Sequence, residues 1–181
     1  MTQAFTDSMD HITSQIRELL APVPSRDIQR TVSLLMKANR LFVYGTGRSG
    51  LLGRAFAIRL VHLGFQAFVI GETITAPVQK NDCVVLISGS GITIPVVMTA
   101  EIAANLKAKI ILLTANTSSP IDSLSDVTII LSPRKKKSHL APLGTLFEAS
   151  SWVFLDGIIA ELMKKKGEDE DTMKKRHAIL E

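Results

Sequence analysis

Two stretches of this chain share a pattern that limits the folds open to it. Each is an apolar run that ends in a turn of glycine and serine and continues into a helical pattern; they cover residues 41–50 and 84–91. A strand that ends in a glycine turn and opens into a helix is a unit of parallel α/β sheets, and its turn offers backbone N–H groups to an anion. Two such turns in one sheet predict a phosphorylated ligand held between them.

The rest of the chain alternates helix and strand signals. Short Val, Ile and Leu runs without polar alternation are typical of strands covered on both faces, and they predict five strands, at residues 41–44, 67–70, 84–87, 109–113 and 127–131. Helical patterns occupy residues 5–19, 25–35, 49–63, 93–106 and 146–163. This alternation predicts a three-layer α/β/α sandwich with a five-stranded parallel sheet of flavodoxin or Rossmann type.

The length of 181 residues and the hydrophobic content of 46% fit one domain with a sizeable core. We expect a single domain over residues 1–181. Its N-terminal helices lie in residues 1–38, its α/β core in 39–163, and a charged connection with the C-terminal segment in 164–181. Ser25 is expected to cap the second helix.

The charge and cysteine content exclude several classes of function. The net charge is +4, but the basic clusters are scattered and partly mixed with acidic residues, so we expect a solvated surface that favours small anions and no nucleic-acid partner. Cys83 is the only cysteine, which excludes an internal disulfide bond. No apolar run reaches membrane-spanning length and the N-terminus lacks signal-peptide features, so we expect a cytoplasmic protein without a membrane partner.

The second turn carries groups suited to a phosphoester. Ser88 and Ser90 offer hydroxyl donors, and Gly89 and Gly91 allow the backbone to approach a ligand closely. Thr93 stands at the start of the following helix, whose positive end favours an anion. These residues also fit an ordinary tight turn and helix cap, but the matching turn on a nearby strand favours the phosphate site.

The first turn, residues 45–50, has the G-x-G-x-x-G spacing of dinucleotide-binding folds. Glu72 follows the next strand, where such a fold places the acid that binds ribose. The chain leaves little room for a substrate domain, however, and that fingerprint does not call for a second Ser-Gly-Ser-Gly turn. We therefore expect Gly47, Arg48 and Ser49 to contact a phosphorylated substrate, and Glu72 to contact its sugar or to shape the cleft.

Six segments of the chain carry a family resemblance. They are residues 45–50, 55–64, 71–73, 88–91, 142–148 and 176–181. Through them the whole chain resembles the sugar isomerase (SIS) domain family, and within it the 6-phospho-3-hexuloisomerases. Ile92 departs from the pattern, since an acidic residue is expected there, and residues 73–77 read Thr-Ile-Thr-Ala-Pro in place of a run of threonines before proline. Both departures concern substrate contacts, among which Ile92 and Thr93 are counted, rather than the fold.

The resemblance implies the reversible conversion of 3-hexulose 6-phosphate into fructose 6-phosphate by a homotetramer, with no redox cofactor and no metal. Moving a ketone from C3 to C2 requires removal of a proton beside the carbonyl, an enediolate, and return of the proton to the neighbouring carbon; one carboxylate can perform both transfers. Glu148 is the candidate base, because it begins an apolar helix after the 142–145 turn and matches the family position. A glutamate there also suits the helix dipole.

Two histidines are candidates to assist at the enediolate oxygens. His62 lies at the end of the helix that the first turn begins, so it would act in the site of a neighbouring subunit. His177 lies in the family-like C-terminal segment, which could fold over an adjoining site. The sequence does not choose between them. The four histidines are dispersed and no H-E-x-x-H motif or cysteine pair is present, so no metal site is expected.

Two other functions remain open. The chain could be a phosphosugar-sensing SIS module without catalytic activity, or an isomerase of the arabinose 5-phosphate type. The glutamate at position 148 favours catalysis over sensing.

Overall fold

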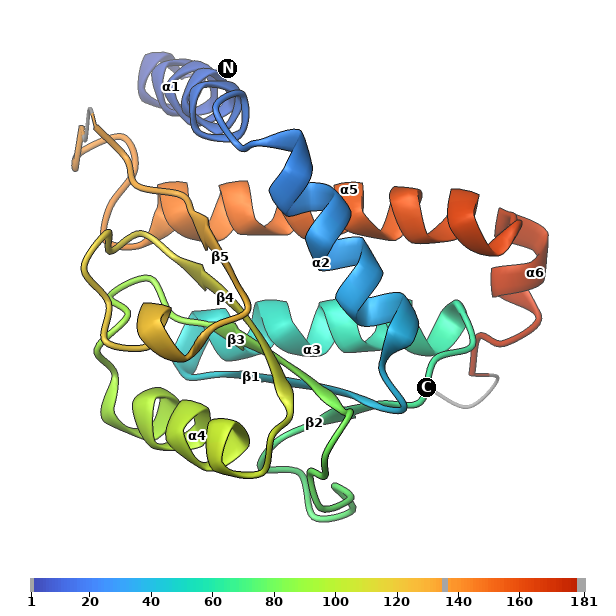
Figure 1. Ribbon diagram of the computed structural model, residues 1–181. Coiled ribbons are helices and arrows are strands. Elements are labelled where there is room, and N and C mark those ends of the chain that lie inside the picture. The colour runs from blue at the N-terminus through green and yellow to red at the C-terminus, as the bar shows by residue number, and fades with distance from the viewer. Residues whose placement is uncertain (1, 135–136, 179–181) are drawn as a thin grey trace.

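The computed structural model describes residues 2–134 and 137–178. It contains one parallel sheet between two helical layers, which confirms the predicted three-layer α/β/α sandwich (Figure 1). The sheet has the order β2-β1-β3-β4-β5, and its strands are β1 (Leu41–Gly45), β2 (Ala67–Val69), β3 (Cys83–Ile87), β4 (Lys109–Thr114) and β5 (Val127–Ile130). Residues 179–181 of the predicted C-terminal segment lie outside the described residues.

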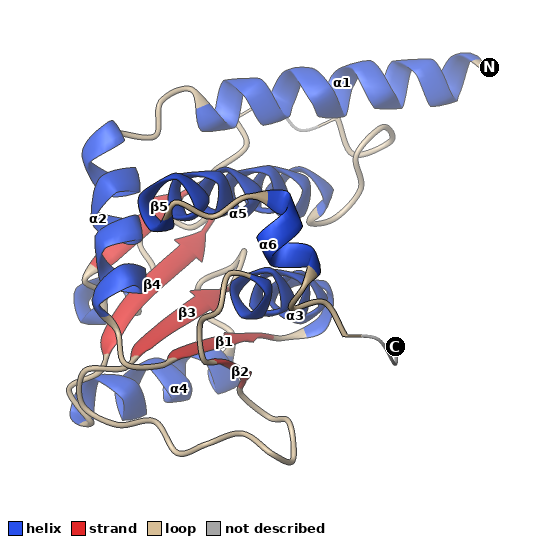
Figure 2. Cartoon of the chain, turned by 90° about the vertical axis from the view of Figure 1, so that its right-hand side faces the viewer, coloured by secondary structure: helices blue, strands red, loops and turns tan. Residues whose placement is uncertain are grey.

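The helices divide unequally between the two faces of the sheet. They are α1 (Gln3–Leu20), α2 (Ser25–Lys37), α3 (Gly47–His62), α4 (Ile94–Asn105), α5 (Thr145–Lys166) and α6 (Glu170–Lys174), with a short 3₁₀ turn η1 (Asp122–Leu124). One face carries α2, α3 and α5, and the other carries α4 (Figure 1). Helix α1 packs on α5, and its N-terminal end reaches beyond the other elements (Figure 2).

The central strands are buried on both sides, as their unbroken apolar runs predict. Successive side chains of a strand alternate between the two faces. Val43 and Val85 pack in the core under α2, α3 and α5, whereas Phe42 and Val84 pack in the core under α4. Because both cores lie against the middle of the sheet, the carboxyl ends of the strands remain available for a site.

Two local expectations were wrong. Pro24 occupies the cap position of α2 and Ser25 is its first helical residue, with no side-chain cap hydrogen bond. Helix α6 was expected to be part of a charged connection, because its stretch has no apolar periodicity. Asp169 caps this helix by accepting a hydrogen bond from the Thr172 N–H over 2.8 Å, and Met173 anchors it in the core.

Helices that could cross a membrane require a long apolar stretch with few charges. Over residues 2–134 and 137–178, none of the helices meets this requirement.

Candidate active site

The two glycine and serine turns lie side by side at one edge of the sheet. Gly45 at the end of β1 is paired with Ile87 at the end of β3, so both turns begin at the same level. The strand order reverses between these strands, since β2 lies on one side of β1 and β3 to β5 lie on the other. Ligands of open α/β sheets bind at this switch point, outside the carboxyl ends of the strands. The predicted adjacency of the turns is therefore confirmed.

Close backbone packing explains part of the first glycine pattern. A Cβ atom on Gly50 would lie only 2.6 Å from the carbonyl oxygen of Gly45, closer than real Cβ atoms approach such an atom. Helix α3 thus begins directly against the end of β1, with Arg48 and Ser49 in its first turn. The G-x-G-x-x-G spacing here serves this strand-to-helix contact.

Hydroxyl groups gather at the second turn, where α4 begins. The Ser88 hydroxyl is buried, accepts a hydrogen bond from the Gly91 N–H over 3.2 Å and lies 3.3 Å from the Thr93 hydroxyl. The Ser90 side chain is exposed, and its hydroxyl lies 3.1 Å from that of Thr93. Gly91 has a φ of +65°, and a Cβ atom there would lie 2.7 Å from the Ser119 hydroxyl. Ser88 therefore shapes the turn, while Ser90 faces outward.

Glu148 lies in the first turn of α5 and is held by a residue of the first glycine turn. Its Oε2 accepts a hydrogen bond from the Arg48 Nε over 2.5 Å. The Glu148 side chain is 17% exposed and that of Arg48 is 69% exposed. The ion pair thus connects the start of α3 to the start of α5 and leaves the arginine open to solvent.

A cavity of about 300 Å³ joins these parts. Its lining comes from the two turns, the ends of β4 and β5 and the start of α5: Ser49, Gly89, Ser90, Ala115, Pro133, Leu143, Gly144, Leu146, Phe147 and Glu148. Four predicted site residues therefore share one cavity, whose volume is at the lower end of the range for small-molecule sites.

Other predicted contacts lie around this cavity. Arg48 borders it through its ion pair with Glu148, and Ser88, Gly91 and Thr93 hold the turn that carries Ser90. The Ile92 side chain is 60% exposed and does not line the cavity.

The structure separates Glu72 and Gly47 from Glu148. Gly47 lines a different cavity, of about 380 Å³, between the ends of β1 and β2. Glu72 lies beside that second cavity, where its Oε1 is 2.7 Å from the Nη2 of Arg54, which also lines it. The first glycine turn therefore has two sides, with Ser49 facing Glu148 and Gly47 facing β2.

Both candidate histidines lie at the opposite end of α3. Their rings stack with centroids 4.8 Å apart, and His62 is buried while His177 is exposed. Arg176 donates a hydrogen bond to the carbonyl oxygen of His62 over 3.1 Å and so holds the C-terminal segment in place. Since the 16 residues of α3 span about 24 Å, neither histidine shares a cavity with Glu148 of its own chain.

Sequence reasoning missed the apolar wall of the cavity. Pro133, Leu143 and Phe147 come from the segment after β5 and from the start of α5, and Gly89 is close enough that its Cβ would lie 3.0 Å from the Phe147 ring. The segment 142–148 was singled out by the resemblance, but an apolar side chain carries no chemical signature of its own. Only its neighbourhood to Glu148 could have indicated its place.

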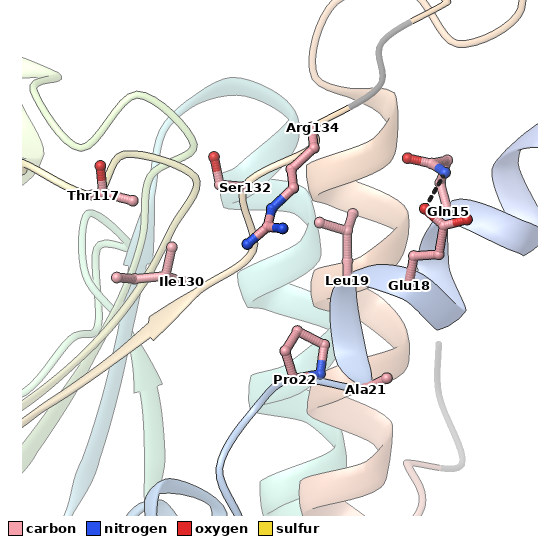
Figure 3. Close-up of a pocket in the computed structure, with 9 residues that line it drawn as sticks. All are labelled: Gln15, Glu18, Leu19, Ala21, Pro22, Thr117, Ile130, Ser132 and Arg134. Carbon is pink, nitrogen blue, oxygen red and sulfur yellow. Dashed lines mark hydrogen bonds between the residues drawn. The ribbon is translucent and has the colours of Figure 1, made fainter.

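A larger cavity of about 790 Å³ lies beside the site, between the end of α1 and the residues that follow β4 and β5. Figure 3 shows the Arg134 side chain extending into it from one side, and Gln15 hydrogen-bonded to Glu18 on the other. Its lining contains none of the predicted site residues. Within the described ranges, no group of three His, Cys, Asp or Glu side chains is placed to hold a metal ion.

Known proteins share both the sequence and this arrangement. The chain is 42% identical to the 3-hexulose-6-phosphate isomerase of Methanocaldococcus jannaschii over 149 residues, which cover 82% of this chain and 81% of that protein. It is 34% identical to the 3-hexulose-6-phosphate isomerase of Bacillus subtilis over 182 residues, or 97% and 98% of the two chains.

A solved structure agrees with these relatives. A hypothetical protein of Methanococcus jannaschii, for which the function of a 3-hexulose-6-phosphate isomerase has been inferred, superposes with a TM-score of 0.89. It is 36% identical in sequence, and the match covers 97% of this chain and 99% of that one. The model of the SIS domain matches residues 34–150, which span both turns and Glu148. The chain therefore belongs to the SIS domain family.

Proposed function

We propose that this chain is a phosphosugar isomerase that interconverts 3-hexulose 6-phosphate and fructose 6-phosphate. The observation that carries the proposal is that Glu148 and the Ser90 turn line the same cavity of about 300 Å³. A base and an anion-binding turn in one cavity are what an isomerase of phosphorylated sugars requires. The relatives that bear the name 3-hexulose-6-phosphate isomerase, at 34% and 42% identity, support the choice of substrate.

In this proposal the phosphate group binds at the start of α4. The exposed Ser90 hydroxyl, supported by Thr93, donates to a phosphate oxygen, and Ser49 donates from the start of α3. Both helices direct their positive ends toward this region, which favours a dianion further. The apolar wall of Leu143 and Phe147 then faces the carbon chain of the sugar.

Glu148 performs the proton transfer between carbons. Its carboxylate takes the proton from C2 of 3-hexulose 6-phosphate, and the electron pair of that bond forms the C2–C3 double bond while negative charge moves to O3. The same carboxyl group then returns the proton to C3, and the hydroxyl proton passes from O2 to O3, so that the carbonyl is now at C2. Arg48, at the edge of the cavity, offsets the charge that develops on the oxygens.

A histidine of a neighbouring copy completes this proposed site. His62 and His177 lie together at the far end of α3, so each would reach an enediolate only in the site of another subunit. The homotetramer implied by the family resemblance would supply such a neighbour. The imidazole would carry the proton between O2 and O3, a task suited to its pKa range in proteins.

A coupled assay of fructose 6-phosphate formation from 3-hexulose 6-phosphate tests the proposal. Glu148→Gln should reduce kcat by about 10²- to 10⁴-fold while fructose 6-phosphate still binds. Asp156→Asn is the matched control, because it makes the same carboxylate-to-amide change on an exposed position of the same helix and should retain activity.

Three outcomes would contradict the proposal in different ways. Full activity of Glu148→Gln would remove this residue from the role of base. Binding of fructose 6-phosphate by the unmodified chain without turnover of either sugar would indicate a sensing module. Preferred turnover of arabinose 5-phosphate would keep the reaction class and change the substrate.

A further inference from the structure

Helix α4 is apolar around most of its circumference. Its sequence over residues 94–105 contains a single charged residue, Glu101. A helix with apolar residues on all sides is normally covered on all sides. In this structure one side packs on the sheet, where Val96, Ala100 and Ala103 are buried.

The opposite side of α4 carries a row of exposed apolar side chains, which we call the α4 stripe. The helix contributes Ile94, Met98 and Ile102, which follow one another at intervals of four residues and are 72%, 55% and 57% exposed. Ile92 before the helix and Leu106 after it extend the row and are 60% and 42% exposed. In the part of the chain that the structure describes, α4 is the only α-helix on this face of the sheet (Figure 1).

We propose that the α4 stripe is a contact surface for a second copy of this chain, whose α4 packs against it in the antiparallel direction. The spacing supports this pairing, because a two-fold axis level with Ala100 sets Met98 opposite Ile102 of the other copy. The same axis sets Ile94 opposite Leu106 of the other copy. A two-fold interface must be complementary to itself, and this row of side chains meets that condition along its whole length.

The area of the stripe also fits an interface between copies. Five large side chains that are 42% to 72% exposed form an apolar surface on the order of several hundred Å², near the upper limit for a monomer. A stable interface buries about 800 Å² on each partner, with an apolar centre and a polar rim. The stripe provides the centre, and the exposed Glu101 and Lys107 beside it have opposite charges, so two copies would not repel each other there.

The pairing gives a structural meaning to Ile92. The resemblance placed an acidic residue at this position among the substrate contacts, yet the isoleucine is exposed and outside the cavity. An apolar side chain in that place extends the contact surface. The stripe begins directly after the Ser88–Gly91 turn, so a second copy would also hold the start of α4, where the proposed function places the phosphate.

The mass of the protein in solution, measured by light scattering after size-exclusion chromatography, tests the pairing. Met98→Glu should lower the mass of the native assembly by half, because a carboxylate cannot be buried in an apolar contact without a partner. Met36→Glu is the matched control, since it makes the same change at an exposed position of α2 and should leave the mass unchanged. Circular dichroism should show both variants folded.

Disulfide formation tests the direction of the helices. Cys83 is buried, and burial raises the pKa of its thiol, so it does not compete for cross-links. Co-expressed Ile94→Cys and Leu106→Cys chains should form a disulfide-linked dimer under mild oxidation, whereas either variant alone should not, because equal positions lie about 18 Å apart along antiparallel helices.

A monomeric unmodified chain, or an unchanged mass for Met98→Glu, would overturn the proposal. A cross-link formed by Ile94→Cys alone would overturn the antiparallel arrangement. Neither measurement uses isomerase activity, so this surface and the proposed function can fail independently of each other.

Discussion

The Arg48 Nε donates a hydrogen bond to the Glu148 Oε2 over 2.5 Å, although the two residues are separated by 100 positions in the sequence. Arg48 belongs to the first glycine turn and Glu148 to the first turn of α5. The contact therefore fixes the candidate base relative to the switch point of the sheet. It also brings a positive charge to the edge of the cavity in which we place the enediolate.

Arg48→Ala should lower kcat/KM for the proposed isomerisation by about 10- to 100-fold, because the variant loses both the orientation of Glu148 and the positive charge. The melting temperature should stay within a few degrees of that of the unmodified chain, since an ion pair with a 69% exposed arginine adds less than about 1 kcal/mol. Arg26→Ala, which removes another exposed ion pair on α2, is the control for both measurements. A large drop in the melting temperature of Arg48→Ala would assign the pair a structural role.

Mixed assemblies should show whether a histidine acts across subunits. Glu148→Gln and His62→Asn chains, each with little activity, should recover part of it when they are co-expressed, because some sites then combine an intact glutamate with an intact histidine. The same experiment with His177→Asn distinguishes the two histidines. If the histidine served the site of its own chain, every mixed site would keep one defect and no activity would return.

Gly91→Ala should destabilise the protein by about 2 to 4 kcal/mol, because φ is +65° there and the new Cβ would lie 2.7 Å from the Ser119 side chain. Gly157→Ala is a control with the opposite sign. Nothing lies within 4 Å of a Cβ atom at position 157 of α5, so alanine should stabilise the helix by about 0.5 to 1 kcal/mol. Denaturant unfolding followed by circular dichroism measures both changes, and equal effects of the two variants would contradict the prediction.

The C-terminal helix should come loose in acid. Arg176 donates two hydrogen bonds to the carboxylate of Glu168, over 2.9 Å and 3.0 Å, and these hold the pKa of Glu168 below its ordinary value. A carboxyl group whose pKa is lowered by folding stabilises the folded form above its ordinary pKa of about 4.3, and this contribution disappears as the pH falls through the lowered value.

Hydrogen-exchange protection factors of the α6 amides measure this effect. They should be constant from about pH 7 to pH 5 and should decrease below about pH 4. Glu168→Gln, which cannot ionise at this position, should have lower protection at neutral pH and no decrease in acid. A decrease of the same size in that variant would assign the transition to another group.

Much of the sheet could be predicted from the sequence, because apolar runs buried on both faces are local features. The strand expected at residues 109–113 is observed as Lys109–Thr114, and the one expected at 84–87 as Cys83–Ile87. Helix α6 was missed because five charged and polar residues with one buried methionine have no periodicity. Its position depends on the end of α3, which only the folded chain brings near.

The site was predictable where its residues follow strand ends directly. Ser49 and Ser90 meet in one cavity because β1 and β3 are neighbours, as their matching turns indicated. Glu72 follows β2, on the far side of β1, and therefore faces a different cavity through Arg54. Distance in the sequence contains no information on which side of a helix start a residue lies, so this separation required the tertiary structure.

The close approach of Gly50 to the Gly45 carbonyl divides the cavity wall into two parts with different freedom to evolve. On the side of the first turn, main chain touches main chain and leaves no space for a larger residue. On the side of α5, the wall consists of side chains such as Leu143 and Phe147, which can be exchanged without moving the backbone. A change of sugar preference during divergence would therefore be recorded in residues 133–147, while the glycine turn would be the same in enzymes with different substrates.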